Sequence, residues 1–193
     1  MGLGCYHTLG QRMEDAWRRA GQDVRGFPEI AASALSHFDP PDFDPVELGR
    51  YLLHTSIVQQ PQTRFSNLPL MLYRSEGFYL ELLVWTKGTT SIHQHGFSGA
   101  FRVVAGSSLH TDYRFLAHRH LGSHMTVGEV QACGMRRLVA GDVMPIRSGP
   151  DGLIHSLFHL DNPSATLVAR TWQDPDAGPQ YELLQPGISL ATP

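Results

Sequence analysis

Hydrophobic residues in the first third of the chain recur every three or four positions, which is the spacing of an amphipathic helix. Residues 11–20 show this pattern, and residues 27–38 repeat it with a proline in the first turn. A third helix is expected after Asp44, because aspartate is a preferred N-cap and Pro45 suits the first helical position. Residues 1–66 are therefore predicted to form a helical segment that packs on the rest of the protein.

From residue 67 onward the apolar positions alternate with polar ones or form short runs bounded by Gly, Pro, Asn and Asp. Many short strands without helices between them are typical of an all-β sandwich or barrel. The pair Cys133-Gly134 is one of the expected corners, and residues 67–193 are predicted to form one β domain. The expected strands are residues 70–74, 78–85, 91–95, 100–104, 108–115, 126–132, 135–138, 142–146, 153–160, 166–171 and 181–184.

The composition is that of an ordinary globular protein and not of a disordered one. Hydrophobic residues make up 41% of the 193 positions, and charged residues make up 17%. The formal net charge is -3 and there is no basic block, which argues against a nucleic-acid partner.

The sequence shows no signal for a membrane or for export. No run of about eighteen apolar residues is available to span a membrane, and the first residues do not resemble a secretory signal. The cysteines Cys5 and Cys133 are far apart, which excludes a thiolate zinc finger and favours reducing surroundings. A cytoplasmic protein with no membrane partner is expected.

Two histidines separated by one residue, His93 and His95, are the most informative feature of the β domain. Side chains at this spacing lie on the same face of a strand. Neutral imidazole is a common ligand of zinc, copper, iron and nickel, so the pair predicts a metal site. A third ligand must come from elsewhere in the fold.

The surroundings of this pair resemble the first motif of the cupin superfamily. Gly88, His93, His95 and Gly106 stand in the motif's order, and Gly99 occupies the place of its usual glutamate. The resemblance implies an all-β fold, the cupin (jelly-roll, double-stranded β-helix) barrel, here with an N-terminal helical segment. Because the glutamate is missing, the site would consist of histidines.

Residues 150–159 resemble the second cupin motif, with His155 at the motif's histidine and His159 where asparagine is usual. The two residues are four apart on one expected strand, so both side chains point to the same face. Either one is a candidate for the third metal ligand. We favour His155, and His159 would then line the pocket or support a ligand.

Within the superfamily, the sequence is most similar to the cysteine dioxygenase-like thiol dioxygenases. Trp85, Gly88 and the segment 91–95 (Ser-Ile-His-Gln-His) carry this resemblance. It implies three histidines around Fe(II), with Arg74 binding a substrate carboxylate. Two positions depart from the family pattern: Gln94 stands where Asp is common, and the nearest residue to the family's catalytic tyrosine is Trp172.

Other side chains have an expected place around the site. Phe97, Phe101 and Leu157 are candidates for an apolar lining, and His110 is expected to face the pocket. For Arg74 there is a second interpretation, in which it pairs with Glu76 or Glu81 on the surface. His118, His120 and His124 mimic ligand spacing, but their polar surroundings favour a solvated loop.

The sequence therefore predicts a Fe(II) dioxygenase that acts on a small thiol or carboxylate, with dioxygen as the second substrate. With nickel or zinc in the same site, a non-oxidative isomerase or lyase, or a small-molecule binding protein, is the alternative. A homodimer through the barrel edges is an expectation based on the superfamily.

Overall fold

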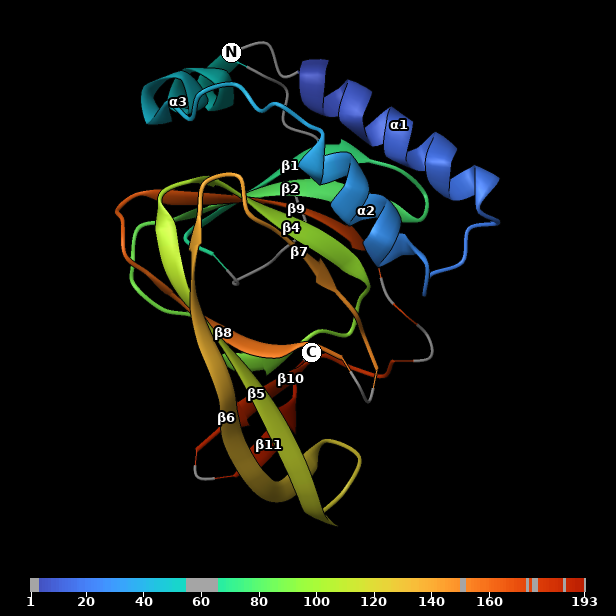
Figure 1. The fold of residues 1–193 in the computed structure, drawn as a ribbon, viewed down its shortest axis with the longest axis vertical. Helices are drawn as coiled ribbons and strands as arrows, with labels where there is room; N and C mark the ends of the chain where they lie inside the picture. Colours follow the sequence, from blue (N-terminus) through green and yellow to red (C-terminus); the bar gives the residue numbers. More distant parts are fainter. Residues whose placement is uncertain are drawn as a thin grey trace.

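The computed structural model describes residues 4–54, 66–149, 152–172, 174, 177–185 and 187–192. Within these residues the chain forms helices first and strands afterwards (Figure 1). The helices are α1 (Gly4–Arg19), α2 (Phe27–Ser36) and α3 (Pro45–His54). The strands are β1 (Leu68–Arg74), β2 (Phe78–Trp85), β3 (Ile92–Gln94), β4 (Gly99–Ala105), β5 (Ser107–His120), β6 (Met125–Val139), β7 (Val143–Ile146), β8 (Ile154–His159), β9 (Ser164–Thr171), β10 (Tyr181–Leu184) and β11 (Ile188–Ala191).

The strands form two antiparallel sheets. One has five strands in the order β1-β2-β9-β4-β7, and the other closes on itself in the order β10-β11-β6-β5-β8-β3. The chain crosses from one sheet to the other at most connections between β2 and β9, which is the jelly-roll arrangement. The expected architecture, an all-β barrel of the jelly-roll type with an N-terminal helical segment, is confirmed.

The helix starts follow local sequence chemistry. The Asp44 carboxylate accepts hydrogen bonds from the backbone N–H groups of Val46 (2.8 Å) and Glu47 (3.4 Å), as expected of an N-cap. Helix α1 is longer than predicted, because the buried stripe begins at Tyr6 and not near residue 11. No helix in the described part of the chain is long and apolar enough to cross a membrane.

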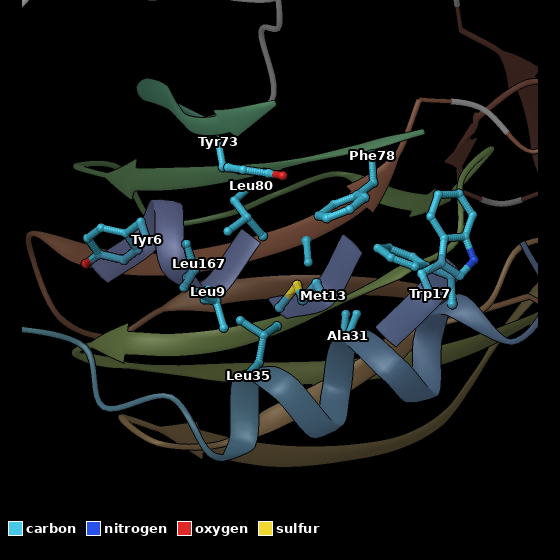
Figure 2. Close-up of a cluster of buried hydrophobic side chains, with 13 residues drawn as sticks. Tyr6, Leu9, Met13, Trp17, Ala31, Leu35, Tyr73, Phe78, Leu80 and Leu167 are labelled. Carbon is cyan, nitrogen blue, oxygen red and sulfur yellow. The ribbon is translucent and has the colours of Figure 1, made fainter. Parts of the chain in front are cut away.

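Helices α1 and α2 lie across the outer face of the five-stranded sheet (Figure 1). Their apolar stripes meet the sheet in one cluster (Figure 2). In this cluster Trp17 and Phe27 pack on Phe78. The cluster consists of Tyr6, Leu9, Met13, Trp17, Phe27, Ala31, Leu35, Tyr73, Phe78, Leu80, Ala100, Leu167 and Ala169. These contacts hold the helical segment on the barrel.

Strand β2 is buried along its whole length, which explains its nearly unbroken hydrophobic sequence. Phe78 and Leu80 belong to the outer cluster beneath the helices. Leu83 and Trp85 belong to a second cluster inside the barrel. Because side chains alternate along a strand, Glu81 also points to the inside.

The largest difference from the predicted strands is the hairpin of β5 and β6, which projects beyond the barrel (Figure 1). The predicted corner at Cys133-Gly134 is wrong, since β6 continues through it. The pairing register shifts there, with Asp112 opposite Gly134 and Tyr113 opposite Ala132, so Cys133 forms a β-bulge. His118 and His120 are exposed strand residues of this hairpin and not part of a loop.

Candidate metal centre

Strand pairing brings the three histidines together inside the barrel. His93 lies on β3 and pairs directly with His155 on β8, and His95 follows the end of β3. Their ligand nitrogens all lie within 4.8 Å of one another. The side chains are almost fully buried, with exposed fractions of 1% for His93, 4% for His95 and 2% for His155. In the described residues, no other group of three or more potential ligands meets this criterion.

The geometry of the group fits a divalent metal ion. His95 Nε2 and His155 Nε2 are 3.0 Å apart. Two nitrogens that each lie about 2.1 Å from one ion and meet it at a right angle are about 3.0 Å apart. Three imidazoles are a donor set that suits zinc, copper, iron and nickel, so the residues present fit such an ion.

Hydrogen bonds orient two of the rings and set the protonation of one of them. His93 Nδ1 is 2.9 Å from the carbonyl oxygen of Ser91, and because a carbonyl only accepts, this nitrogen must carry the proton. The lone pair of His93 is then on Nε2. His155 Nδ1 lies 2.8 Å from His110 Nε2, so His110 stands behind His155 in the buried interior. Such partners commonly orient the ligands of a metal.

Burial keeps these imidazoles neutral. It lowers the pKa of His93 to about 4, and a hydrogen bond to Ser91 opposes this only partly. Burial also holds the pKa of His95 and His155 well below the ordinary value, and neighbouring histidines lower both further. Neutral imidazole is the form that binds metals, so these rings are ready to act as ligands at neutral pH.

Of the two candidates for the third position, the structure groups His155 and not His159 with His93 and His95. His159 Nδ1 makes a 2.8 Å hydrogen bond with the Ser164 hydroxyl. Its ring stacks on Trp85 with the centroids 4.6 Å apart. Residues 150 and 151, the start of the second motif, lie outside the described residues.

Arg74 lies at the end of β1 and is exposed. Its guanidinium stands over the ring of Trp172, 4.9 Å from the centroid. The alternative surface pairing with Glu81 is wrong, because Glu81 is buried and pairs with Arg170 instead. The contacts of Arg74 are thus with an aromatic side chain and not with the histidine group.

Arg170 on β9 is a cation near the histidines that the sequence analysis missed. Its Nη1 is 3.5 Å from Glu81 Oε1. Its Cζ lies 3.5 Å from the centroid of the Phe97 ring, and that ring is 4.5 Å from His95. The sequence did contain a signal for this pair: Glu81 is the one acidic residue in the otherwise apolar β2, and Arg170 is the one basic residue in the largely apolar β9.

The expected apolar lining is present. Phe97, Phe101 and Leu157 belong to the buried cluster inside the barrel. The ring of Phe101 is 6.2 Å from His155 and 6.4 Å from His110. The histidines therefore face hydrocarbon on this side, which limits access of water.

Gly99, at the position of the usual cupin glutamate, has no room for a side chain. A Cβ atom built there would lie 2.1 Å from the carbonyl oxygen of Ala169 on the paired strand β9. The absence of the carboxylate ligand is therefore a consequence of how closely the two backbones approach.

A scan against protein-family models found no match, and a search of curated proteins found none either. Among solved structures, it is similar to oxalate decarboxylases at low identity. The Lactobacillus farciminis enzyme in complex with formate shares 19% identity over 52% of this chain and 25% of its own, with a TM-score of 0.36. A Bacillus subtilis oxalate decarboxylase mutant shares 18% identity over 56% of this chain and 25% of its own, with a TM-score of 0.38. The chain thus spans about a quarter of the length of these enzymes.

Proposed function

We propose that the protein is a mononuclear metalloenzyme of the cupin type, a non-haem Fe(II) dioxygenase acting on a small thiol or carboxylate. The observation that carries this proposal is the buried group of His93, His95 and His155, which is made of neutral imidazoles. The resemblance of the segment 91–95 to the thiol dioxygenases supports iron as the metal and dioxygen as the oxidant.

The ligand set favours an anionic substrate. Because all three ligands are neutral, they leave the +2 charge of the ion uncompensated. A thiolate or carboxylate entering the barrel would therefore be attracted to the centre more strongly than a neutral molecule. A ferrous ion bound there would activate dioxygen, and the electrons that reduce the dioxygen would come from the substrate as it is oxidised.

Residues around the centre would hold the Nδ1 proton of His155 in place and would keep water away from the metal. If His155 binds through Nε2, its Nδ1 carries the proton, and this N–H donates a hydrogen bond to His110 Nε2. His110 Nδ1 then carries a proton and faces Asp112 Oδ1, 3.5 Å away. This Asp112–His110–His155 series would hold the ring in one tautomer and orientation. Phe97 and Phe101 would exclude water from the reacting atoms.

The test combines metal analysis with oxygen consumption. The purified protein is reconstituted with Fe(II), and oxygen uptake is followed with thiol carboxylates, with thiols that lack a carboxylate and with simple carboxylates. We expect about one iron per chain and uptake that needs both Fe(II) and one of these substrates. His93→Ala should abolish both, whereas His118→Ala, a matched change on the exposed hairpin, should alter neither.

Other outcomes point to other classes of protein. Stoichiometric zinc or nickel with no oxygen uptake would contradict the dioxygenase and favour an isomerase, a lyase or a metal-dependent binding protein. Failure of every divalent transition metal to bind would overturn the metalloenzyme altogether.

A further inference from the structure

A second buried polar group lies beside the histidines, on the inner face of the five-stranded sheet. Tyr79 pairs with Arg170 across β2 and β9, and Glu81 pairs with Val168. Glu81 and Arg170 are therefore diagonal neighbours on one face. Their side chains are 3% and 19% exposed, so both charges are largely removed from water.

The ion pair between them is incomplete. The distance of 3.5 Å from Nη1 to Oε1 exceeds the usual separation of about 2.7–2.9 Å in a charge-assisted hydrogen bond. Glu81 Oε2 and Arg170 Nε are both buried, and neither has a hydrogen-bond partner among the residues that the structure describes. A pair that served stability alone would be expected to satisfy these atoms, because buried unpaired polar atoms are costly.

The position of Arg170 links it to the metal centre. Its guanidinium stacks on the Phe97 ring, whose other neighbour is His95. Its positive charge is also felt at His95, where it contributes to the lowered pKa after burial and His93. The Arg170 side chain is 19% exposed, so the protein does not enclose it completely.

Arg74, the arginine that the family resemblance would select, is held differently. It stands over Trp172, and Trp172 in turn packs on Tyr79 with ring centroids 4.5 Å apart. Arg170 also lies near Tyr79, with Cζ 5.4 Å from the centroid. Contacts through Trp172 and Tyr79 thus connect Arg74 to Arg170, and it is Arg170 that contacts Phe97, a neighbour of His95.

We propose that Arg170, positioned by Glu81, is the specificity-determining residue that binds the carboxylate of the ligand whose other end occupies the histidine centre. This inference rests on the proposed function. Glu81 lies beside one prong of the guanidinium and the Phe97 ring lies against its face, and the N–H groups that do not point to Glu81 would donate to a carboxylate. A planar guanidinium presents donors at the spacing of the two carboxylate oxygens, which selects carboxylates over neutral groups.

The test uses the full-length protein reconstituted with Co(II), whose absorption spectrum reports ligands entering the centre. The probes are 3-mercaptopropionate and 3-mercapto-1-propanol, which differ only in the carboxylate, and propionate, which lacks the thiol. We expect wild type to bind the thiol carboxylate about tenfold or more tightly than the thiol alcohol. The double variant Glu81→Gln/Arg170→Gln should reduce this ratio to about twofold or less, with cobalt content and affinity for the alcohol unchanged.

Further variants distinguish a loss of carboxylate binding from a loss of the folded structure. The double variant removes both charges together, because removing one partner alone would leave an uncompensated buried charge. Arg170→Lys keeps the charge pair and loses only the two-pronged donor. The ratio of the affinities for the thiol carboxylate and the thiol alcohol should therefore lie between those of the wild type and the double variant. Arg119→Gln, a matched change at an exposed arginine of β5, should leave the ratio as in wild type.

Two results would overturn the inference: a wild type with no preference for the carboxylate, or a preference lost in Arg74→Gln and kept in the double variant. The proposed function fails separately, if the Fe(II) protein takes up no oxygen with any of these substrates while the carboxylate preference of the Co(II) protein still needs Arg170. If 3-mercaptopropionate binds no more tightly than propionate, only the thiol substrate is excluded, and the role of Arg170 stands.

Discussion

The two faces of the five-stranded sheet use the same strands for opposite purposes. On the outer face, Phe78 and Leu80 of β2 meet the helices in a cluster made of hydrocarbon and aromatic rings (Figure 2). On the inner face, Glu81 of β2 lies near the histidine centre and holds Arg170. One strand thus contributes apolar side chains to the layer on one side and a buried charge to the other.

The difference between the two faces indicates that the outer face contributes mainly to stability and the inner face mainly to the candidate site. Burying an apolar side chain stabilises the fold by about 1.5–3 kcal/mol, whereas burying a polar group without full hydrogen bonding costs about 1–3 kcal/mol. The helices α1 and α2 therefore offset what the inner face loses. Changes on the outer face should alter stability and leave the site intact, and changes on the inner face should do the reverse.

The largest expected effect is on the outer face. Phe78→Ala removes a fully buried ring between the helices and the sheet, so the free energy of unfolding should fall by about 3–5 kcal/mol. Chemical denaturation measures this change. Val46→Ala on the exposed side of α3 is the control and should change stability by less than about 0.5 kcal/mol. If the folded Phe78→Ala variant bound a different amount of metal per chain, the outer face would not be independent of the metal site.

The second effect is a loss of folding stability at low pH, and its cause is a buried histidine inside the barrel. Burial lowers the pKa of His159 to about 4 from a usual value of 6.5. Between these values the unfolded chain takes up a proton that the folded chain does not, so the stability of the metal-free protein falls as the pH falls from about 6.5 to 4. His159 alone should contribute about 3 kcal/mol to this fall.

The variant His159→Asn keeps an acceptor for Ser164 and removes the titrating ring. Stability measured between pH 7 and pH 4 should therefore depend less steeply on pH in this variant. His118→Asn, at an exposed position, should retain the wild-type slope. Equal slopes in all three proteins would show that His159 is not kept neutral by the barrel.

The third effect concerns the support of the metal centre. His110→Gln removes the ring that bonds His155 Nδ1, so metal affinity should fall by about 10–100-fold. Competition with a chelator measures the affinity. Asp112→Asn acts one step farther away, across a 3.5 Å contact, and should weaken binding less. An unchanged affinity in His110→Gln would mean that the barrel wall alone orients His155.

The smallest effect lies at the edge of the outer cluster. The Tyr73 hydroxyl donates a hydrogen bond to the Glu14 carboxylate and joins α1 to β1. Burial, followed by this carboxylate, raises the pKa of Tyr73 to about 12, so the hydroxyl remains a donor at neutral pH. Tyr73→Phe should cost about 1 kcal/mol in thermal or chemical unfolding. Adding Glu14→Gln should cost little more if the two groups act as a pair.

The sequence predicted best what depends on one strand or helix at a time. Strand β2 was located from Phe78 to Trp85 because both of its faces are buried, so apolar residues fill nearly every position. The N-cap at Asp44 was also readable, because a cap is formed by residues that are adjacent in the chain. The spacing of His93 and His95 indicated a common face for the same reason.

Features that depend on distant residues were harder to predict. The Glu81–Arg170 pair joins residues far apart in the chain, and only the register of β2 against β9 makes them neighbours. Strand β11 was missed because four residues after a glycine carry too little pattern, although pairing with β6 and β10 stabilises them. The choice between His155 and His159 likewise required the pairing of His155 with His93.

The narrow gap at Gly99 has a consequence for how this barrel could evolve. In the superfamily pattern that the sequence resembles, this position offers a glutamate to the metal, yet here any side chain would collide with the backbone of β9. A carboxylate ligand is therefore out of reach of a single mutation at this site. A lineage with this barrel would first have to separate β4 from β9, or would have to recruit its acid from another strand.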